Sequence, residues 1–395
     1  MMGSEKLRLS LICILIYVVV AGFVTQIGLL TGPIASAYNK EVTSTTAIFS
    51  FLTGGFLAGT FAAYFLLDYI RIKSVVLGYG LLLIISVSGI LFIENYSVLP
   101  IFLGIIGLVT GISTCIAGIV IGRLWEAKKR ESFFIGLDAA YNLGGVFFPF
   151  VTTYILLRQL PWAYCLLAVA VFVVVILYLS LQSSFSNINP DKNMLASQGE
   201  VEWNSGIIVA GVSLFFVIHG KYSIILWLPQ YAQNVLALGP EEAGKLISSV
   251  FSTALIGSVA GIYIIAKIRI MYFICAALLI GALCGLLFTV AHNYAITVLI
   301  AATFGLAVSV LYNVFVVYGL NFVSRPSHKH ISFIIVSSGI AATIAPYSSS
   351  IIVGWLGNSV AGLYAGSLSY FLAFSVLLLH VNIHPVLSAR NQRVN

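Results

Sequence analysis

Ionisable side chains stand inside long apolar segments at a few positions of this 395-residue sequence. Asp138 lies early in one such run, and His219 and Lys221 flank a glycine inside another. A carboxylate, an imidazole and an ammonium group are all costly in hydrocarbon, so such groups pair, bind a proton or face a polar solute. The chemistry they predict is the binding and movement of protons and small charged molecules.

A polar stripe follows the fifth long apolar run. At 100° per residue, Asp138 shares one helix face with Tyr141, Asn142 and Thr152. Packing between helices is the simpler explanation for Tyr141 and Thr152, although Tyr141 stays in the candidate site. For Asp138 we favour a function, either as a protonatable coupling site or as a gate partner of a basic residue such as Arg123.

His219 and Lys221 lie two positions apart and therefore point to nearly opposite sides of a regular helix. His219 shares its face with Tyr222. Both basic groups reach one cavity only if the helix is broken at Gly220, as transporter helices often are. We expect them to present positive charge to an anionic or strongly hydrogen-bonding solute. Asp138 and Lys221 differ by about 14 Å in depth at ~1.5 Å rise per residue, too far for a salt bridge.

Polar residues on other runs complete the candidate site. On the tenth run Gly305, Ser309, Tyr312 and Asn313 share a face and resemble a cavity wall. The predicted substrate-binding residues are Gln26, Tyr141, Asn142, His219, Lys221, Tyr222, Tyr312 and Asn313.

The composition identifies the class of protein that must position these groups. Hydrophobic residues make up 60% of the chain and charged residues only 8%. A soluble protein carries roughly 25% charged residues, so the chain is predicted to be an integral membrane protein. The net charge of +7 comes from basic residues in short hinges, which does not predict nucleic-acid binding.

Catalytic and cofactor motifs are missing from the sequence. The five cysteines are scattered, without the spacing of a disulfide framework or a zinc site. The chain shows no nucleotide-binding loop, paired carboxylates or Ser-His-Asp order. We therefore expect no enzyme, no cofactor, no metal and no ATP-driven pump.

Twelve apolar runs are long enough to cross a bilayer, which takes roughly 20 residues. They lie near 9–35, 43–67, 74–93, 97–122, 133–156, 161–182, 206–229, 242–265, 270–290, 294–319, 330–355 and 361–383. We predict an N-terminal six-helix bundle at 1–182, a cytoplasmic linker at 183–204, and a C-terminal six-helix bundle with a short tail at 205–395.

The basic residues predict the orientation. If both termini are cytoplasmic, 15 of the 19 Lys and Arg residues lie on the cytoplasmic side. The other four are Lys40, Arg158, Lys221 and Lys245. We expect a multi-pass protein of the bacterial inner membrane with an uncleaved first helix.

The two halves repeat each other in part. Arg71 and Arg269 stand in similar hinges 198 positions apart. The helices before these hinges carry Gly55-x-x-x-Gly59 and Gly257-x-x-x-Gly261, a spacing of small residues that lets helices approach closely. A parallel duplication of six helices accounts for both features.

The hinge at residues 68–73 resembles that of the major facilitator superfamily, although both glycines of the family pattern are missing. The run from Gly144 to Pro149 is similar to a glycine-containing run of the same family. A closer resemblance, to TsgA-like transporters near the fucose permease branch, rests on residues 138–149 (DAAYNLGGVFFP), 227–232 (WLPQYA) and 242–248 (EAGKLIS).

This resemblance implies two six-helix bundles that rock about one central site, in a protein that is a monomer by default. It also implies that Asp68, Arg71 and Lys73 lock the cytoplasmic side of one state. For Lys73 we favour a simpler role, positive charge that sets the topology.

The function predicted is secondary transport of a small polar or anionic solute, coupled to protons. A polycarboxylate, a siderophore-like ligand or a sugar would each suit it. Export of a drug or toxic anion is the alternative, only partly supported by the Gly144–Pro149 run. A membrane enzyme acting on lipid and a transport-dead sensor or scaffold are less favoured, because the acidic residues are dispersed and the polar segments are short.

Overall fold

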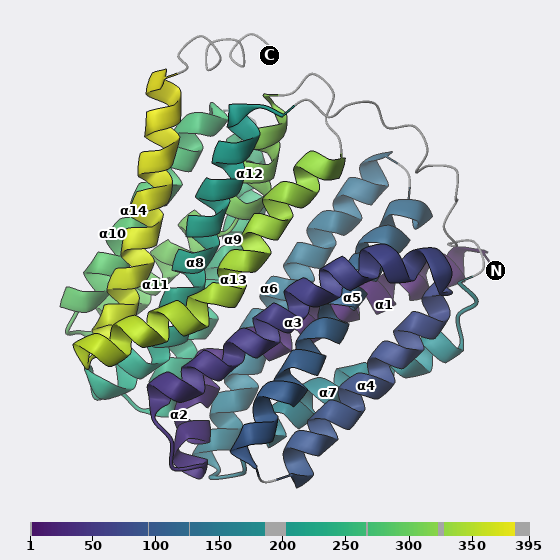
Figure 1. Ribbon diagram of the computed structural model, residues 1–395, viewed down its shortest axis with the longest axis horizontal. Coiled ribbons are helices and arrows are strands. Elements are labelled where there is room, and N and C mark those ends of the chain that lie inside the picture. The colour runs from purple at the N-terminus through teal and green to yellow at the C-terminus, as the bar shows by residue number, and fades with distance from the viewer. Residues whose placement is uncertain are drawn as a thin grey trace. The chain divides into compact units, whose positions relative to one another are not determined.

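The structure, a computed structural model, describes residues 2–93, 95–125, 127–185, 203–265, 268–322 and 328–383 (Figure 1). Some side chains within these ranges, that of Asp68 among them, lie outside the described part. In the described ranges every regular element is a helix, and twelve helical segments are long and apolar enough to cross a membrane. The prediction of an all-helical protein with twelve spans is confirmed.

The first compact unit comprises residues 1–196. Its apolar runs form helices because a helix satisfies its own backbone hydrogen bonds, which lipid cannot do. These elements are α1 (Met2–Val24), α2 (Ile27–Ala37), α3 (Val42–Tyr69), α4 (Ile72–Phe92), the 3-10 turn η1 (Tyr96–Val98), α5 (Leu99–Leu124), α6 (Ala127–Leu157) and α7 (Tyr164–Leu181).

The second compact unit comprises residues 197–395. Its helices are α8 (Ser205–Asn234), α9 (Pro240–Ile265), α10 (Ile270–Val290), α11 (Tyr294–Val308), α12 (Leu311–Leu320), α13 (His328–Leu356) and α14 (Val360–Ile383). We refer to the two bodies as unit 1 and unit 2.

The helices of each unit pack in the same pattern. In unit 1, α1 contacts α5, α6 and α7, while α3 lies along α5 and α4 along α7. In unit 2, α8 contacts α12, α13 and α14, while α9 lies along α11 and α10 along α14. Each contact in one unit thus has its counterpart in the other, as a duplication of six helices requires.

Two pairs of residues show how closely the repeat is kept. Arg71 and Arg269 are the N-cap residues of α4 and α10, with φ/ψ of −62°/132° and −59°/127°. Asn95 and Asn293, also 198 positions apart, each accept a hydrogen bond from the backbone N–H two residues later. Asn95 caps the 3-10 turn η1, which leads into α5, and Asn293 caps α11.

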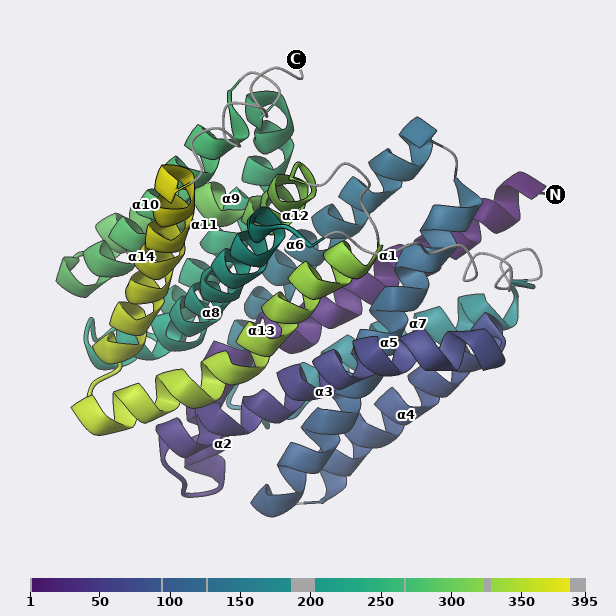
Figure 2. The same cartoon turned by 45° about the horizontal axis from the view of Figure 1, so that its top comes forward.

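Glycines allow two pairs of helices to touch backbone to backbone. The helices α3 and α5 lie side by side (Figure 2), and a Cβ atom on Gly59 would be 2.8 Å from the carbonyl carbon of Leu108. In unit 2 a Cβ atom on Gly257 of α9 would be 2.6 Å from the carbonyl oxygen of Leu306 on α11. Such distances exclude any side chain, so these glycines serve the close packing predicted for them.

Two of the predicted spans are interrupted. The first is divided at Thr25–Gln26, between α1 and α2, and the tenth at Ser309–Val310, between α11 and α12. This interruption divides the face predicted for the tenth span between α11 and α12. Gly305 faces α9 instead, where its Cβ atom would lie 2.8 Å from the carbonyl carbon of Val250.

Candidate functional site

His219 joins three helices of unit 2. Its Nδ1 atom lies 2.8 Å from Ser369 Oγ on α14, and its Nε2 atom lies 2.7 Å from Ser348 Oγ on α13. The ring of Phe215, one turn earlier on α8, stacks against it at 6.4 Å between centroids and 16° between planes. The imidazole is half-buried. Both of its nitrogens are thus engaged by hydroxyl groups from outside α8.

The helix α8 continues through Gly220, so the break that would have turned His219 and Lys221 to one side is absent. At Gly220 a Cβ atom would be 2.8 Å from the backbone oxygen of Gly366 on α14. This glycine serves close packing rather than a hinge. With His219 facing α13 and α14, Lys221 lies about 200° further round the same helix. The condition under which both basic groups would reach one cavity is therefore not met in this structure, and their assignment to the solute stays a prediction.

Tyr222 and the two candidates on α12 lie in the same unit. The hydroxyl groups of Tyr222 and Tyr312 interact electrostatically, and α12 packs against α8. Tyr312 is half-buried and Asn313 is exposed on the surface of the unit. The structure therefore brings Tyr222 and Tyr312 together, whereas Asn313 is exposed.

In unit 1, Gln26 lies at the break between α1 and α2 and is fully buried. Its Nε2 group donates a hydrogen bond to the carbonyl oxygen of Gly22, and its Oε1 atom accepts one from the hydroxyl of Thr152 on α6. Both polar ends of the amide are thus used inside the unit. Thr152 links two helices, as the packing interpretation predicts.

The polar stripe on α6 runs from the surface into the core of unit 1. Asp138 is exposed, Tyr141 is half-buried and Asn142 is 8% exposed. The neighbouring Gly144 faces α1, where a Cβ atom would lie 2.7 Å from that of Ala21. The carboxylate therefore belongs to the open part of the stripe, and its assignment as a coupling or gating group stays a prediction.

The charged residues at the helix ends occupy different positions. Arg71 caps α4 with its backbone and has an exposed side chain, and Arg123 is exposed in the last turn of α5. Asp68 lies in the last turn of α3, but its side chain is outside the described residues. Lys73 donates hydrogen bonds to the carbonyl oxygens of Leu181 and Ser183 at the end of α7. It therefore caps a helix in addition to carrying positive charge.

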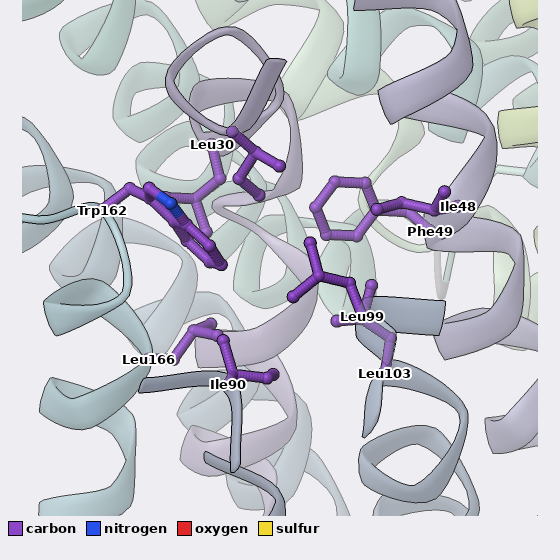
Figure 3. Close-up of a pocket in the computed structure, with 9 residues that line it drawn as sticks. Leu30, Ile48, Phe49, Ile90, Leu99, Leu103, Trp162 and Leu166 are labelled. Atoms are coloured by element: carbon purple, nitrogen blue, oxygen red, sulfur yellow. The ribbon is translucent and has the colours of Figure 1, made fainter. Parts of the chain in front are cut away.

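A cavity in unit 1 lies between α2, α3, α4, α5 and α7 with the segment that leads into it (Figure 3). Its lining consists of Leu30, Ile34, Ile48, Phe49, Ile90, Leu99, Leu103, Trp162 and Leu166. All of these side chains are aliphatic or aromatic. The cavity is thus unsuited to a polar solute, and it contains none of the predicted site residues.

Metal-binding side chains do not gather in the part of the chain that the structure describes. No group of three or more His, Cys, Asp or Glu residues there is placed to hold a metal ion. The polar clusters around His219 and around Gln26 are built from hydroxyl, amide and imidazole groups.

Comparison with known proteins identifies the family. The family model described as Major Facilitator Superfamily matches residues 11–330, most of the chain. The chain belongs to the major facilitator superfamily. This membership agrees with two units of repeated packing and twelve membrane-spanning segments among the described residues.

Relatives of this superfamily member match over nearly their whole length. A "Protein TsgA homolog" of Buchnera aphidicola is 25% identical over 97% of the chain and 98% of the relative. Protein TsgA of Shigella dysenteriae is 24% identical over 96% of both chains. A TsgA homolog of Serratia proteamaculans is 26% identical, again over 96% of both. The predicted resemblance to TsgA-like proteins is confirmed.

Membership in a transporter superfamily establishes a general role in secondary transport for this multi-pass membrane protein. The hydroxyl groups that hold His219 were missed by sequence reasoning, because Ser348 and Ser369 lie 129 and 150 positions away. A signal was present nevertheless, since three consecutive serines at 348–350 stand inside an apolar span.

Proposed function

We propose that this chain is a proton-coupled secondary transporter of a small anionic solute, working by alternating access of its two halves. A compact polycarboxylate is the favoured solute, and a siderophore-like ligand would present the same carboxylate chemistry. A sugar is the main uncharged candidate. The favoured mode is symport, in which the solute and protons cross the membrane in the same direction.

The sign of the ionisable groups in the spans of unit 2 supports an anionic solute. Those spans contain His219, Lys221, Lys245 and His380, whereas after residue 202 the only acidic residues are Glu241 and Glu242 in the first turn of α9. Glu241 forms a salt bridge with Lys245, and both side chains are about half exposed. The middle of the membrane-spanning part of this unit is therefore basic.

Lys221 is the group that we assign to the solute. A lysine presents a compact positive charge with three donors, which suits a carboxylate. We expect Tyr222 and Tyr312 to contribute hydroxyl groups nearby, because their hydroxyls already interact on adjoining helices.

The test is purified protein in proteoliposomes, with solute-evoked charge and proton movement recorded across a panel of sugars, monocarboxylates and polycarboxylates. We expect a response to a carboxylate that falls at least tenfold in Lys221→Ala and recovers in part in Lys221→Arg. Lys245→Ala is the matched control, because its charge is already neutralised by Glu241. A response to sugars alone would overturn the anionic assignment.

Asp138 is the acidic residue that we assign to proton coupling or, with Arg123, to a gate. Replacement by Asn keeps the shape of the side chain and removes its charge. Asp138→Asn is expected to abolish proton movement while leaving the protein folded. Proton movement at the wild-type level in this variant would contradict the assignment.

Export of a drug or toxic anion is the alternative direction. The same proteoliposomes distinguish symport from export. An inward proton gradient drives uptake of the solute by a symporter, whereas it drives extrusion of the solute by an exporter that exchanges it for protons. Silence across the panel from folded protein would favour a sensor or scaffold. We place the protein in the bacterial inner membrane with both termini cytoplasmic, on the distribution of its basic residues.

A further inference from the structure

The imidazole of His219 is held at both nitrogens by hydroxyl groups of two other helices. Ser369 Oγ lies 2.8 Å from Nδ1 and Ser348 Oγ lies 2.7 Å from Nε2. Which group donates in each of these two bonds depends on the protonation state of the ring, and each serine has a further contact of its own.

Each of these hydroxyl groups also reaches a backbone carbonyl of its own helix. Ser369 Oγ is 2.8 Å from the oxygen of Ala365, and Ser348 Oγ is 2.9 Å from the oxygen of Ile344. A carbonyl oxygen only accepts, and a hydroxyl has one proton to give. When that proton is given to the carbonyl, the serine oxygen offers its lone pairs to the imidazole.

The arrangement therefore suits the protonated ring. An imidazolium has two N–H donors, and in this geometry both meet a serine oxygen at hydrogen-bond distance. Hydrogen bonds from a charged donor are shorter and stronger than those between neutral groups. The charge is thus accommodated by oxygens without a carboxylate.

The neutral ring also keeps a partner at each nitrogen. Loss of one proton turns one nitrogen into an acceptor, and the serine beside it can rotate its hydroxyl toward the ring and release its backbone carbonyl. Every polar atom of the ring keeps a partner in both states, so neither state pays for a buried unsatisfied group. The exchange requires the rotation of one hydroxyl and no movement of a helix.

We propose that His219, held by Ser348 and Ser369, is a reversible proton-binding site in the membrane-spanning part of unit 2. A hydronium ion gives a proton to the hydroxyl oxygen of the serine beside the deprotonated nitrogen, that serine passes its own proton to the ring, and a water molecule is left. The reverse steps return the proton to water. No electron moves and no other bond changes. The ring is only half-buried, and the proposal requires that water reach its exposed part. Coupling of this proton to a solute rests on the proposed function, whereas the proton site itself does not.

Ser348 and Ser369, rather than a nearby carboxylate, determine how readily His219 binds a proton. The titratable and charged groups on the surrounding helices are the following. On α9 they are Glu241, Glu242 and Lys245 near its first turn, on α12 Tyr312 and Tyr318, on α13 His330 and Tyr347, on α14 Tyr364, Tyr370 and His380, and on α8 itself Lys221, Tyr222 and Tyr231. The two glutamates follow the end of α8, which is about 22 Å along the helix from His219 at ~1.5 Å per residue. Among the residues of unit 2 that the structure describes, the acidic groups are thus too distant to hold the proton.

The experiment is nitrogen NMR of protein labelled with ¹⁵N-histidine in lipid nanodiscs, with the His219 signal identified by its loss in His219→Gln. We expect the signal to change from a neutral ring to an imidazolium with two protonated nitrogens between pH 8 and pH 5. The double variant Ser348→Ala with Ser369→Ala removes the acceptors, and its proton affinity is expected to fall by about tenfold or more. Ser375→Ala is the control, since its hydroxyl bonds Phe371 of its own helix.

Two results would overturn the proposal. One is a ring that stays neutral in a single tautomer down to pH 5, and the other is an unchanged titration in the folded double serine variant. The transport assay separates this failure from that of the proposed function. If His219 titrates but no solute of the panel shows proton-driven transport, the proton site is supported and its coupling to a solute is contradicted. If proton-driven transport is observed but His219 does not titrate, the proposed transport function is supported and the proton site at His219 is contradicted.

Discussion

The ammonium group of Lys73 at the start of α4 lies 2.7 Å from the carbonyl oxygen of Ser183, just beyond the end of α7. It also contacts the carbonyl oxygen of Leu181 at 3.2 Å, and Arg8 of α1 donates to that of Gln182 at 2.7 Å. The last carbonyl groups of a helix lack partners within it, and cations there are favourable. Two basic side chains from other helices thus cap the C-terminal end of α7 by donating hydrogen bonds to its last carbonyl groups and those just beyond it.

This contact predicts that Lys73 stabilises unit 1. Lys73→Met keeps the apolar stem and removes the donor, and it should lower the free energy of unfolding by about 1 kcal/mol, the value for an ordinary hydrogen bond at a half-exposed site. Lys73→Arg retains donors and should lose less. Thermal unfolding in detergent, followed by tryptophan fluorescence, measures the difference. Equal unfolding temperatures for Lys73→Met and the wild type would show that the hydrogen bonds of Lys73 do not stabilise unit 1. Its role would then be limited to its positive charge.

The contact between α3 and α5 predicts a strong effect of one methyl group. A Cβ atom on Gly107 would lie 2.8 Å from the backbone nitrogen of Phe56, and backbone cannot move aside as a side chain can. Gly107→Ala should cost about 1–3 kcal/mol, as overpacking does. Gly78→Ala on α4 is the control, because nothing lies within 4 Å of the added atom. If both variants unfold alike, the close approach of the two helices is wrong.

The buried pair of Gln26 and Thr152 predicts a stability effect that a binding residue would not show. Thr152→Val leaves the amide oxygen of Gln26 buried without its donor, at a cost of about 1–3 kcal/mol. Replacing both, as Gln26→Leu with Thr152→Val, should recover much of this loss, because no polar group is then left unsatisfied. A double-mutant cycle in thermal stability measures the coupling. Normal stability in Gln26→Leu together with a raised KM for solute would favour the binding role predicted from the sequence.

The extent of the fold was predictable because the length and continuity of apolar runs decide which segments cross a membrane. The run predicted at 270–290 corresponds to α10, Ile270–Val290. The breaks at Thr25–Gln26 and Ser309–Val310 were not predicted, since neither carries a proline or a glycine within the break itself. Breaks of this kind depend on tertiary contacts, which one sequence does not display.

The candidate site was predictable only in part, for a similar reason. An ionisable group in an apolar run, such as His219, is visible in the sequence because its cost in lipid is general. Its partners are not, since Ser348 and Ser369 resemble the many serines that bond their own helix. The direction in which a polar side chain points depends on whether its helix is continuous. Because α8 continues through Gly220, His219 and Lys221 point to different sides of it.

Gly220 distinguishes a hinge from a packing contact in α8. A Cβ atom there would lie 2.8 Å from the oxygen of Gly366 and 2.9 Å from the ring of Tyr370, so α8 and α14 meet without space for a side chain. Gly220→Ala should therefore lower the thermal stability, by about 1–3 kcal/mol, because the two helices must move apart. A hinge would behave differently, since alanine favours a continuous helix by about 1 kcal/mol over glycine. Stability raised by Gly220→Ala, with transport slowed, would restore the broken helix and the shared cavity for His219 and Lys221.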